Sequence, residues 1–402
     1  MEIRVPSLNR TFEAVRRSET PGGAGAGEGV AAFRDTFDIL AWADPFGPDG
    51  PLPRAVAAAM ASAAATGTGG HYEPPTGYPE LRAALAATVG PRLGRELDPE
   101  RHVLVTPGSD SGLYYTLSAL LEPGDEVLVP TPSYPSNLMA PRLLGATPVA
   151  VPLLANQGYQ LDVDALARAV TDRTRAVVLT HPNNPTSTVH RPDRLHALAE
   201  LVVDRDLVLV SDQAFEDHVY DGVPMVSPAS IPELWERTVS VHSFSKGYGL
   251  SGLRVGYLVA HERLLEPLLA AAVLVLGAPN TLAQVGALAA LRDDTILPGY
   301  ARELEERRTY LHHHLRDVPG VRMRPAESGI LSWVDVHALG SATAVAAHLR
   351  ERAAVVVNEG DAYGPGGEGH LRIVHGALGD RRRLEAAVDR IATALRELTP
   401  RG

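Results

Sequence analysis

Residues 243–256 have the sequence SFSKGYGLSGLRVG, and they include Lys246, the only lysine among the 37 cationic residues of the chain. Arginine can replace lysine in most surface roles, but its guanidinium keeps its proton and cannot attack a carbonyl group. A bias toward arginine explains the missing lysines, whereas it leaves the remaining one unexplained. We therefore interpret Lys246 as a reactive amine.

The residues around Lys246 suit an anion held close to the main chain. Ser243 precedes the lysine, and Arg254 follows it after a glycine-rich turn. Serine hydroxyls and a guanidinium fork are good phosphate ligands, and glycine lets the main chain approach a ligand closely. We expect Ser243 and Arg254 to bind a phosphate group near the amine of Lys246.

Short apolar runs on both sides of this stretch predict a buried sheet. They are rich in Val and Leu and mostly apolar on both faces, as parallel strands are: His102–Pro107, Asp125–Pro130, Pro148–Leu153, Arg175–Thr180, Leu207–Asp212, Thr238–Ser243 and Arg254–Ala260. Leucine stripes of helical period separate several of these runs. The pattern predicts an α/β fold, with a mostly parallel seven-stranded sheet flanked by helices.

The C-terminal part of the chain has a different pattern. A long helix is expected over 300–316, strands near 329–336, 353–358 and 370–374, and a closing helix over 380–398. We assign residues 296–402 to a smaller α+β domain. Residues 1–50 form an N-terminal arm that completes this domain, and residues 51–295 form the large domain.

Composition narrows the partners and the location. The chain has no cysteine, which excludes disulfides, thiolate metal sites and cysteine nucleophiles. A net charge of -11 gives no reason to expect a nucleic acid or an anionic membrane as partner. The N-terminus lacks an apolar segment of signal-peptide length, and the apolar run 268–278 is too short to span a bilayer. We expect a cytoplasmic protein.

Two further features of the sequence do not indicate a binding site. The glycine-rich segment 21–29 contains G-x-G, but it follows no strand, so we expect a flexible arm rather than a dinucleotide site. His312, His313 and His314 are adjacent on a predicted helix, where neighbouring side chains point in different directions. We expect no metal site.

Polar residues stand where several predicted strands end. Asp212 ends the strand-like run DLVLVSD, at the edge where α/β sheets bind ligands. Ser109 and Asp110 lie in TPGSDSG, between a strand and a helix, where main-chain amides attract an anion. Singly, each is also a common helix-capping residue.

Two more strand ends carry groups that suit a flat ligand. Tyr134, in PTPSYPSN, could cover a ring, and Asn184, in THPNNPTS, could donate a hydrogen bond to a ring hydroxyl. Singly, the first is an ordinary loop tyrosine and the second belongs to a turn. The ordered combination is much more specific than any one motif.

From about Leu40 to Arg390, the motifs resemble the class I/II aminotransferases, enzymes of fold type I that depend on pyridoxal 5'-phosphate (PLP). PLP needs an amine, a carboxylate for its pyridine nitrogen, donors for its phosphate and a flat cover for its ring. The resemblance makes Lys246 the Schiff-base lysine and proton carrier. It also implies the partners of the cofactor: Asp212 for the ring nitrogen, Asn184 for O3′, Tyr134 for stacking, and Ser109, Asp110, Ser243 and Arg254 for the phosphate.

The resemblance extends to the substrate and to a second subunit. Tyr72, in GHYEPPTGYPELR, is similar to the tyrosine that reaches the phosphate of the neighbouring subunit, which implies a homodimer with shared active sites. Arg372, in GHLRIVHGAL, is similar to the arginine that binds the substrate α-carboxylate. We expect Trp42 and the N-terminal arm to line the pocket for the substrate side chain.

Three departures from the family pattern concern the site. Ala43 replaces a glycine that lies beside the substrate carboxylate, and His181 and Ser187 change the family sequence N-P-x-N-P-T-G. Phe215 replaces the tyrosine that donates to O3′, so one donor to the cofactor is lost.

The resemblance implies transfer of an amino group between an L-amino acid and a 2-oxo acid. One alternative is another PLP reaction through the same carbanion: a β-elimination lyase, a decarboxylase or an oxygen-using deaminase. The other is a non-catalytic regulator of the same fold. Such regulators often carry a basic DNA-binding extension, and this sequence has none.

Overall fold

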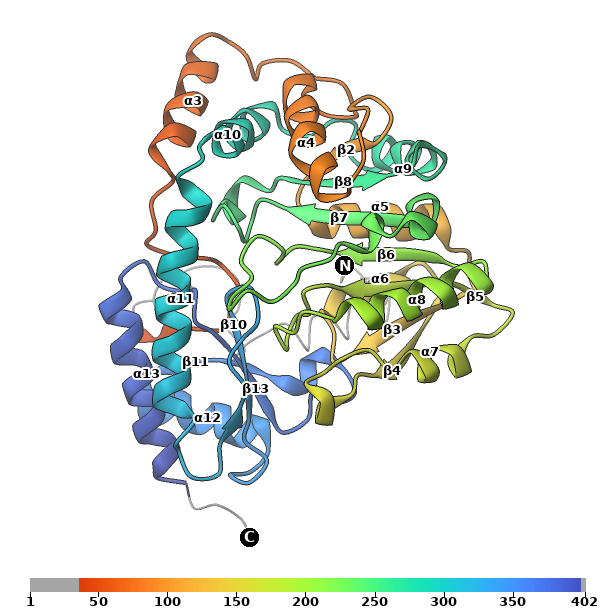
Figure 1. The fold of residues 1–402 in the computed structure, drawn as a ribbon. Coiled ribbons are helices and arrows are strands. Elements are labelled where there is room, and N and C mark those ends of the chain that lie inside the picture. The colour runs from red at the N-terminus through yellow and green to blue at the C-terminus, as the bar shows by residue number, and fades with distance from the viewer. Residues whose placement is uncertain (1–35, 399–402) are drawn as a thin grey trace, which may run out of the picture.

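The computed structural model describes residues 36–398 (Figure 1). Its centre is a seven-stranded sheet with the strand order β2-β8-β7-β6-β5-β3-β4. All neighbouring strands are parallel except β8, which is antiparallel to both β2 and β7. The strands are β2 (Val103–Thr106), β3 (Glu126–Thr131), β4 (Thr147–Pro152), β5 (Thr174–Thr180), β6 (Val208–Asp212), β7 (Thr238–Ser243) and β8 (Gly256–Ala260). The predicted fold class is confirmed.

Successive strand residues pack on opposite faces of this sheet. Val127 and Val129 of β3 belong to a core shared with α5 and α9, whereas Leu128 between them packs in the core under α7 and α8. Both faces of the sheet are therefore buried under helices, which is why the strands are apolar on both sides. The helices are α5 (Ser109–Leu120), α6 (Pro135–Leu143), α7 (Val163–Ala169), α8 (Pro192–Asp204) and α9 (Glu262–Val275).

A third core covers the β2–β8 end of the sheet, at the top of Figure 1. Val105 and Tyr257 contribute to it from the strands, and Leu85 and Ala287 from the helices. Its helices are α3 (Arg54–Ala65), α4 (Pro79–Arg92) and α10 (Thr281–Arg292). Short 3-10 turns connect elements elsewhere: η2 (Ala155–Gln157), η3 (Pro228–Ser230), η4 (Pro232–Arg237), η5 (Ser251–Leu253) and η6 (Gly360–Tyr363).

The C-terminal part forms a separate sheet and core. Its four strands have the order β12-β13-β10-β9 and are antiparallel, and β1 pairs in parallel with β11 beside them. The strands are β1 (Asp38–Ile39), β9 (Arg322–Met323), β10 (Leu331–Asp335), β11 (Val355–Val356), β12 (Asn358–Glu359) and β13 (His370–Val374). The helices are α11 (Ile296–Leu315), α12 (Ala342–Ala353) and α13 (Arg381–Arg396). The domain limits at residues 50 and 295 stay a prediction.

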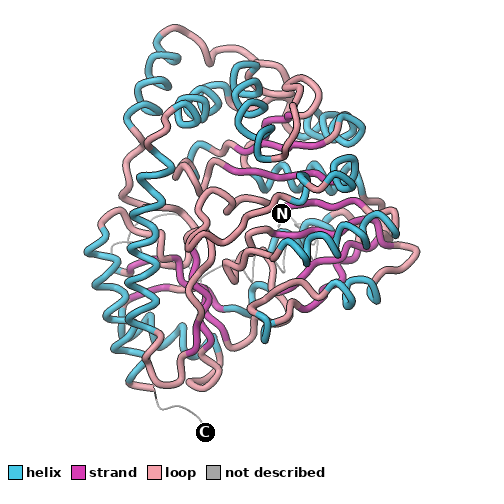
Figure 2. Tube along the Cα trace, viewed as in Figure 1, coloured by secondary structure: helices cyan, strands magenta, loops and turns pink. Residues whose placement is uncertain are grey.

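Loops fill the region between the two sheets (Figure 2). They leave the carboxyl ends of the parallel strands, where α/β proteins bind ligands. The glycine-rich segment 21–29 lies outside the described residues. Between residues 36 and 398, no helix is both long and apolar enough to cross a membrane.

A core substitution tests this packing. Leu209, in the middle of β6, has no exposed surface, so Leu209→Ala should lower the free energy of unfolding by about 2–5 kcal/mol. Leu52→Ala is the matched control, because that side chain is 41% exposed and should cost far less. Urea denaturation of both variants makes the comparison, and equal losses would contradict the packing described.

Candidate active site

The predicted site residues meet at one edge of the seven-stranded sheet. Strands β2, β3, β5 and β6 run in the same direction, so the residues that follow them emerge at the same edge. Because β8 runs in the opposite direction, its start and the preceding Arg254 lie at that edge too. A cavity of about 640 Å³ opens there, lined by eleven of the predicted residues: Trp42, Ala43, Ser109, Asp110, Tyr134, Asn184, Asp212, Phe215, Lys246, Arg254 and Arg372.

Lys246 projects into this cavity from the loop after β7. Its Nζ donates a hydrogen bond to the main-chain oxygen of Ala43 and lies 6.0 Å from the centre of the Phe215 ring. Burial lowers the pKa of the amine to about 8, and the nearby charge of Arg372 acts in the same direction. An amine with this pKa is neutral often enough near neutral pH to act as a nucleophile or a base.

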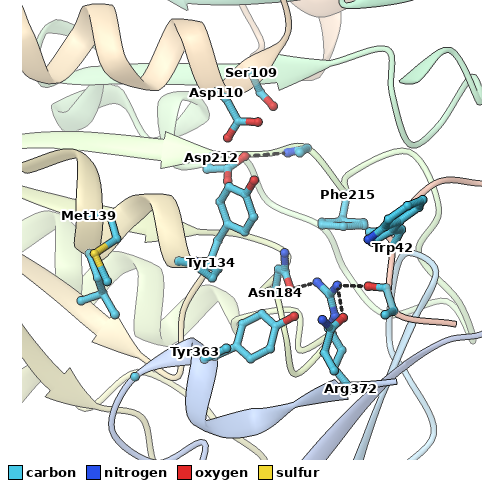
Figure 3. Close-up of a pocket in the computed structure, with 18 of the residues that line it drawn as sticks. Trp42, Ser109, Asp110, Tyr134, Met139, Asn184, Asp212, Phe215, Tyr363 and Arg372 are labelled. Carbon is cyan, nitrogen blue, oxygen red and sulfur yellow. Dashed lines mark hydrogen bonds between the residues drawn. The ribbon is translucent and has the colours of Figure 1, made fainter. Parts of the chain in front are cut away.

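Asp212 is the last residue of β6 and is buried in the same cavity (Figure 3). Its Oδ1 accepts a hydrogen bond from the main-chain nitrogen of Ala214 at 3.1 Å. Burial raises the pKa of this carboxyl to about 7. A buried carboxylate is stabilised by a cation beside it, so the site suits a ligand with a protonated ring nitrogen.

Gly108, Ser109 and Arg254 form a cradle for an anion at the start of α5. Gly108 has a φ of 82°, and a Cβ there would lie 2.7 Å from Nη2 of Arg254. The glycine therefore lets the guanidinium come close to the first turn of the helix. Within residues 36–398, Arg254 forms no ion pair, so its charge is available to a phosphate.

The serine beside this arginine differs from the one predicted. Ser243 ends β7, and its Oγ accepts a hydrogen bond from the main-chain nitrogen of Ser245 at 3.1 Å. The Ser243 side chain thus stabilises the turn and does not line the cavity. Ser245 lines the cavity instead, with its Oγ 3.5 Å from Nη1 of Arg254. Both serines precede Lys246 within three residues, and the motif alone does not distinguish them.

Tyr134 stands beside Asp212, with Phe215 across the cavity (Figure 3). Burial, helped by the charge of Asp110, raises the pKa of the Tyr134 hydroxyl, so the phenol keeps its proton. Asp110 also accepts a hydrogen bond from Ser136 at 3.4 Å. Phe215 is buried and brings no hydroxyl to its wall of the cavity.

Arg372 lies on β13, on the other side of the cavity from the cradle (Figure 3). Its Nη1 donates to Oδ1 of Asn184 at 3.1 Å, and its Nη2 donates to the Ala41 oxygen and to Oδ1 of Asn358, each at 2.7 Å. Its guanidinium lies 5.0 Å from the centre of the Tyr363 ring. Nε is buried and has no hydrogen-bond partner among the described residues.

Sequence reasoning missed Asn358 and Tyr363, which line the cavity beside Arg372. Asn358 begins β12, a strand of only two residues, and Tyr363 ends the 3-10 turn η6 that follows it. Neither belongs to a motif, so nothing in the sequence marked them. Tyr72 is 94% exposed and does not line the cavity of its own chain.

We assign no metal to the described part of the chain. Asp335, His337 and His370 lie near one another, but existing hydrogen bonds occupy them. His337 contacts Oδ1 of Asp335 at 2.9 Å, and the two nitrogens of His370 contact the Glu368 oxygen at 2.8 Å and the Tyr159 hydroxyl at 2.9 Å.

The chain is similar to known proteins over most of its length. The family model "Aminotransferase class I and II" matches residues 43–391. An aspartate aminotransferase of Pyrococcus abyssi is 33% identical over 81% of this chain and 84% of its own. An arginine–pyruvate transaminase of Pseudomonas aeruginosa is 34% identical over 87% and 88% of the two chains. The crystal structure of an aromatic aminotransferase from Pyrococcus horikoshii, 30% identical, superposes with a TM-score of 0.85 over 90% of this chain and 96% of its own.

The lowered pKa of Lys246 can be measured directly. Without a bound aldehyde, its reaction with an amine-directed reagent should have a midpoint near pH 8, above which the amine is neutral. In the unfolded chain the midpoint should move to about 10.4. Peptide mass spectrometry separates Lys246 from the N-terminal amine, and equal midpoints in the folded and unfolded chains would contradict the burial described.

Proposed function

This chain belongs to the class I and II aminotransferases, which depend on PLP, and we propose that Lys246 binds the cofactor in it. The observation that carries the proposal is the position of the only lysine. Its amine, with a lowered pKa, shares one cavity with a buried carboxylate and a free arginine beside a helix start. The activity is transfer of an amino group between an amino acid and a 2-oxo acid.

The groups around the cavity match the parts of the cofactor. When bound, PLP supplies a ring that accepts the electron pair left when a proton leaves the α-carbon. Asp212 stabilises the positive ring nitrogen, and Tyr134 covers the ring. Arg254 and the amides at the start of α5, at Ser109 and Asp110, hold the phosphate. Ser245 is placed to join them.

Asn184 connects the cofactor side of the cavity with the substrate side. Its Oδ1 already accepts from Arg372, so its Nδ2 is the atom left to donate to the O3′ oxygen. Arg372 binds the α-carboxylate of the substrate. A substrate held there would be within reach of Lys246, whose Nζ, as a free amine, would take the proton from the α-carbon and return it in the later step.

Membership in the family does not determine which amino-acid side chain the enzyme accepts. Relatives of similar identity are named for aspartate, for aromatic amino acids and for arginine with pyruvate. Trp42, Met139 and Tyr363 also line the cavity and are the residues we expect to select among amino acids.

We further propose a homodimer in which Tyr72 reaches the phosphate of the partner's cofactor. The Tyr72 side chain is 94% exposed, which leaves it free to contact another subunit. Val273, Leu274, Val275 and Leu276 expose 43–88% of their surface in one apolar run at the end of α9. Such a patch is typical of a protein contact. A cytoplasmic location stays a prediction.

Chemical trapping tests the role of Lys246. Borohydride reduction of the PLP-loaded enzyme should leave the cofactor on the peptide that contains Lys246, as shown by mass spectrometry. Lys246→Ala is the control and should carry no label on that peptide. Label at the N-terminal amine only, or a protein that stays colourless with PLP, would contradict the assignment.

The two arginines should give separate phenotypes. Arg372→Lys loses a two-pronged contact, and one hydrogen bond to a charged group is worth about 1.5–3 kcal/mol, so KM for the amino acid should rise about tenfold or more. Its PLP retention should stay close to wild type. Arg254→Lys should instead lose PLP faster on dialysis. Exchanged phenotypes would show that the assignments are wrong.

Phe215 should affect the protonation of the cofactor–lysine link. A tyrosine hydroxyl there would donate to O3′, stabilise its negative charge and make the linked nitrogen lose its proton more easily. Phe215→Tyr should therefore lower the pH midpoint of the visible absorbance, by about one to two units.

Phe215→Leu is the control for that change, since it also lacks a donor and should keep the wild-type midpoint. An unchanged midpoint in Phe215→Tyr would mean that the ring does not face O3′ or that another donor already serves it.

A further inference from the structure

Gly247, the residue after Lys246, is enclosed by side chains from the segment that follows Asp212. A Cβ added to Gly247 would lie 2.0 Å from Oδ2 of Asp217 and 2.6 Å from its Cβ and Cγ. His218 donates from Nε2 to the main-chain oxygen of Gly247 at 3.1 Å. Two consecutive side chains therefore hold the main chain next to the reactive lysine.

Asp217 belongs to a polar cluster that is largely buried except for the exposed side chain of Arg92. Its neighbour Glu216 contacts Nδ1 of His242 through Oε1 at 2.7 Å, and Nη1 of Arg92 lies 3.7 Å from both Glu216 and Asp217. The His242 ring stacks on Tyr257 with centres 4.6 Å apart. The cluster thus connects the segment after Asp212 with α4, β7 and β8.

The negative charge on the carboxyl groups of Glu216 and Asp217 is reduced by their surroundings. Burial and the neighbouring Glu216 raise the pKa of Asp217 to about 7. Burial also acts to raise the pKa of Glu216, but His242 and Arg92 outweigh it and the pKa is lowered. The two carboxyls therefore share less than two full negative charges near neutral pH, which makes their burial less costly.

The cluster has no direct role in binding a ligand in the cavity. Glu216, Asp217, His242 and Arg92 do not line the cavity and cannot touch substrate or cofactor there. Contacts within a largely buried polar cluster favour one arrangement of its members, although Nε2 of His242 is buried and has no hydrogen-bond partner among the described residues. A cluster that packs against the loop carrying Lys246 (the lysine loop) suggests that this loop must be held in one position.

The segment 212–218 connects two parts of the site. Its first residue, Asp212, faces the cavity, and its end contacts Gly247, whose neighbour Lys246 faces the same cavity. We propose that Asp217 is a positioning residue for Lys246, acting through its contact with Gly247 to set the place of the amine relative to Asp212. This inference rests on the proposed role of Lys246 in binding PLP.

Exchange of side-chain bulk between the two positions tests the contact. Gly247→Ala should displace the lysine loop, and Asp217→Gly should leave a gap beside it. A Cβ at position 247 would collide with Cβ of Asp217, so only glycine at position 217 makes room for it. The double variant moves a side chain from one partner to the other. Asp217→Asn keeps the shape and is the matched control.

Two properties of the PLP-loaded enzyme report the position of Lys246: the pH midpoint of its visible absorbance, and the rate of PLP loss on dialysis. We expect Gly247→Ala and Asp217→Gly each to shift the midpoint and to lose PLP about tenfold faster, since small misplacements of reacting groups have effects of this size or larger. The double variant should return toward wild type in both properties, and Asp217→Asn should stay close to wild type in both.

Several outcomes would overturn the proposal. One is a double variant with the summed defects of the single variants. Another is Asp217→Gly with a lowered Tm but a wild-type midpoint and rate of PLP loss, which is the result of a purely structural role. If Gly247→Ala does not fold, Asp217→Gly against Asp217→Asn decides alone. Failure of the proposed function is distinct, because wild-type protein would then carry no PLP on Lys246.

Discussion

The burial of an amine and a carboxyl group in one cavity is the constraint on which the site depends. Removal from water lowers the pKa of Lys246 to about 8 and raises that of Asp212 to about 7. Each shift disfavours the charged form, and each suits its role. A neutral amine can attack and accept protons, while a buried carboxyl that forms no ion pair among the described residues is stabilised by a protonated ring. The cavity is therefore adapted to an aromatic aldehyde cofactor with a basic ring nitrogen.

The sheet makes this burial possible. Parallel strands place their carboxyl ends at one edge, so Asp212, Tyr134 and Asn184 come together although dozens of residues separate them. The reversed β8 brings Arg254 to the same edge. On the other side of the cavity, the second sheet supplies Arg372 from β13, already held by Asn184 and Asn358. The active site thus lies between two rigid supports.

Much of this arrangement could be predicted from the sequence, because parallel strands buried on both faces leave a clear apolar pattern. The seven strands lie where that pattern placed them, and eleven of the predicted site residues line one cavity. The pattern does not show direction, so the antiparallel β8 was not foreseen. Ser245 instead of Ser243, and the cavity-lining Asn358 and Tyr363, depend on side-chain orientation and on a strand too short to have a period. Asp217 escaped notice because its effect comes from contact with a glycine distant in sequence.

In an aminotransferase the amino group passes from one substrate to the other and is not released. A lyase, a decarboxylase or an oxygen-using deaminase would use the same amine and carboxyl groups. The direct measurement supplies the PLP-loaded enzyme with ¹⁵N-labelled amino acids and an unlabelled 2-oxo acid. We predict that the amino acid formed from the oxo acid carries the label, in amounts equal to the amino acid consumed. Labelled ammonia, or carbon dioxide from the donor without any labelled amino acid, would contradict the account.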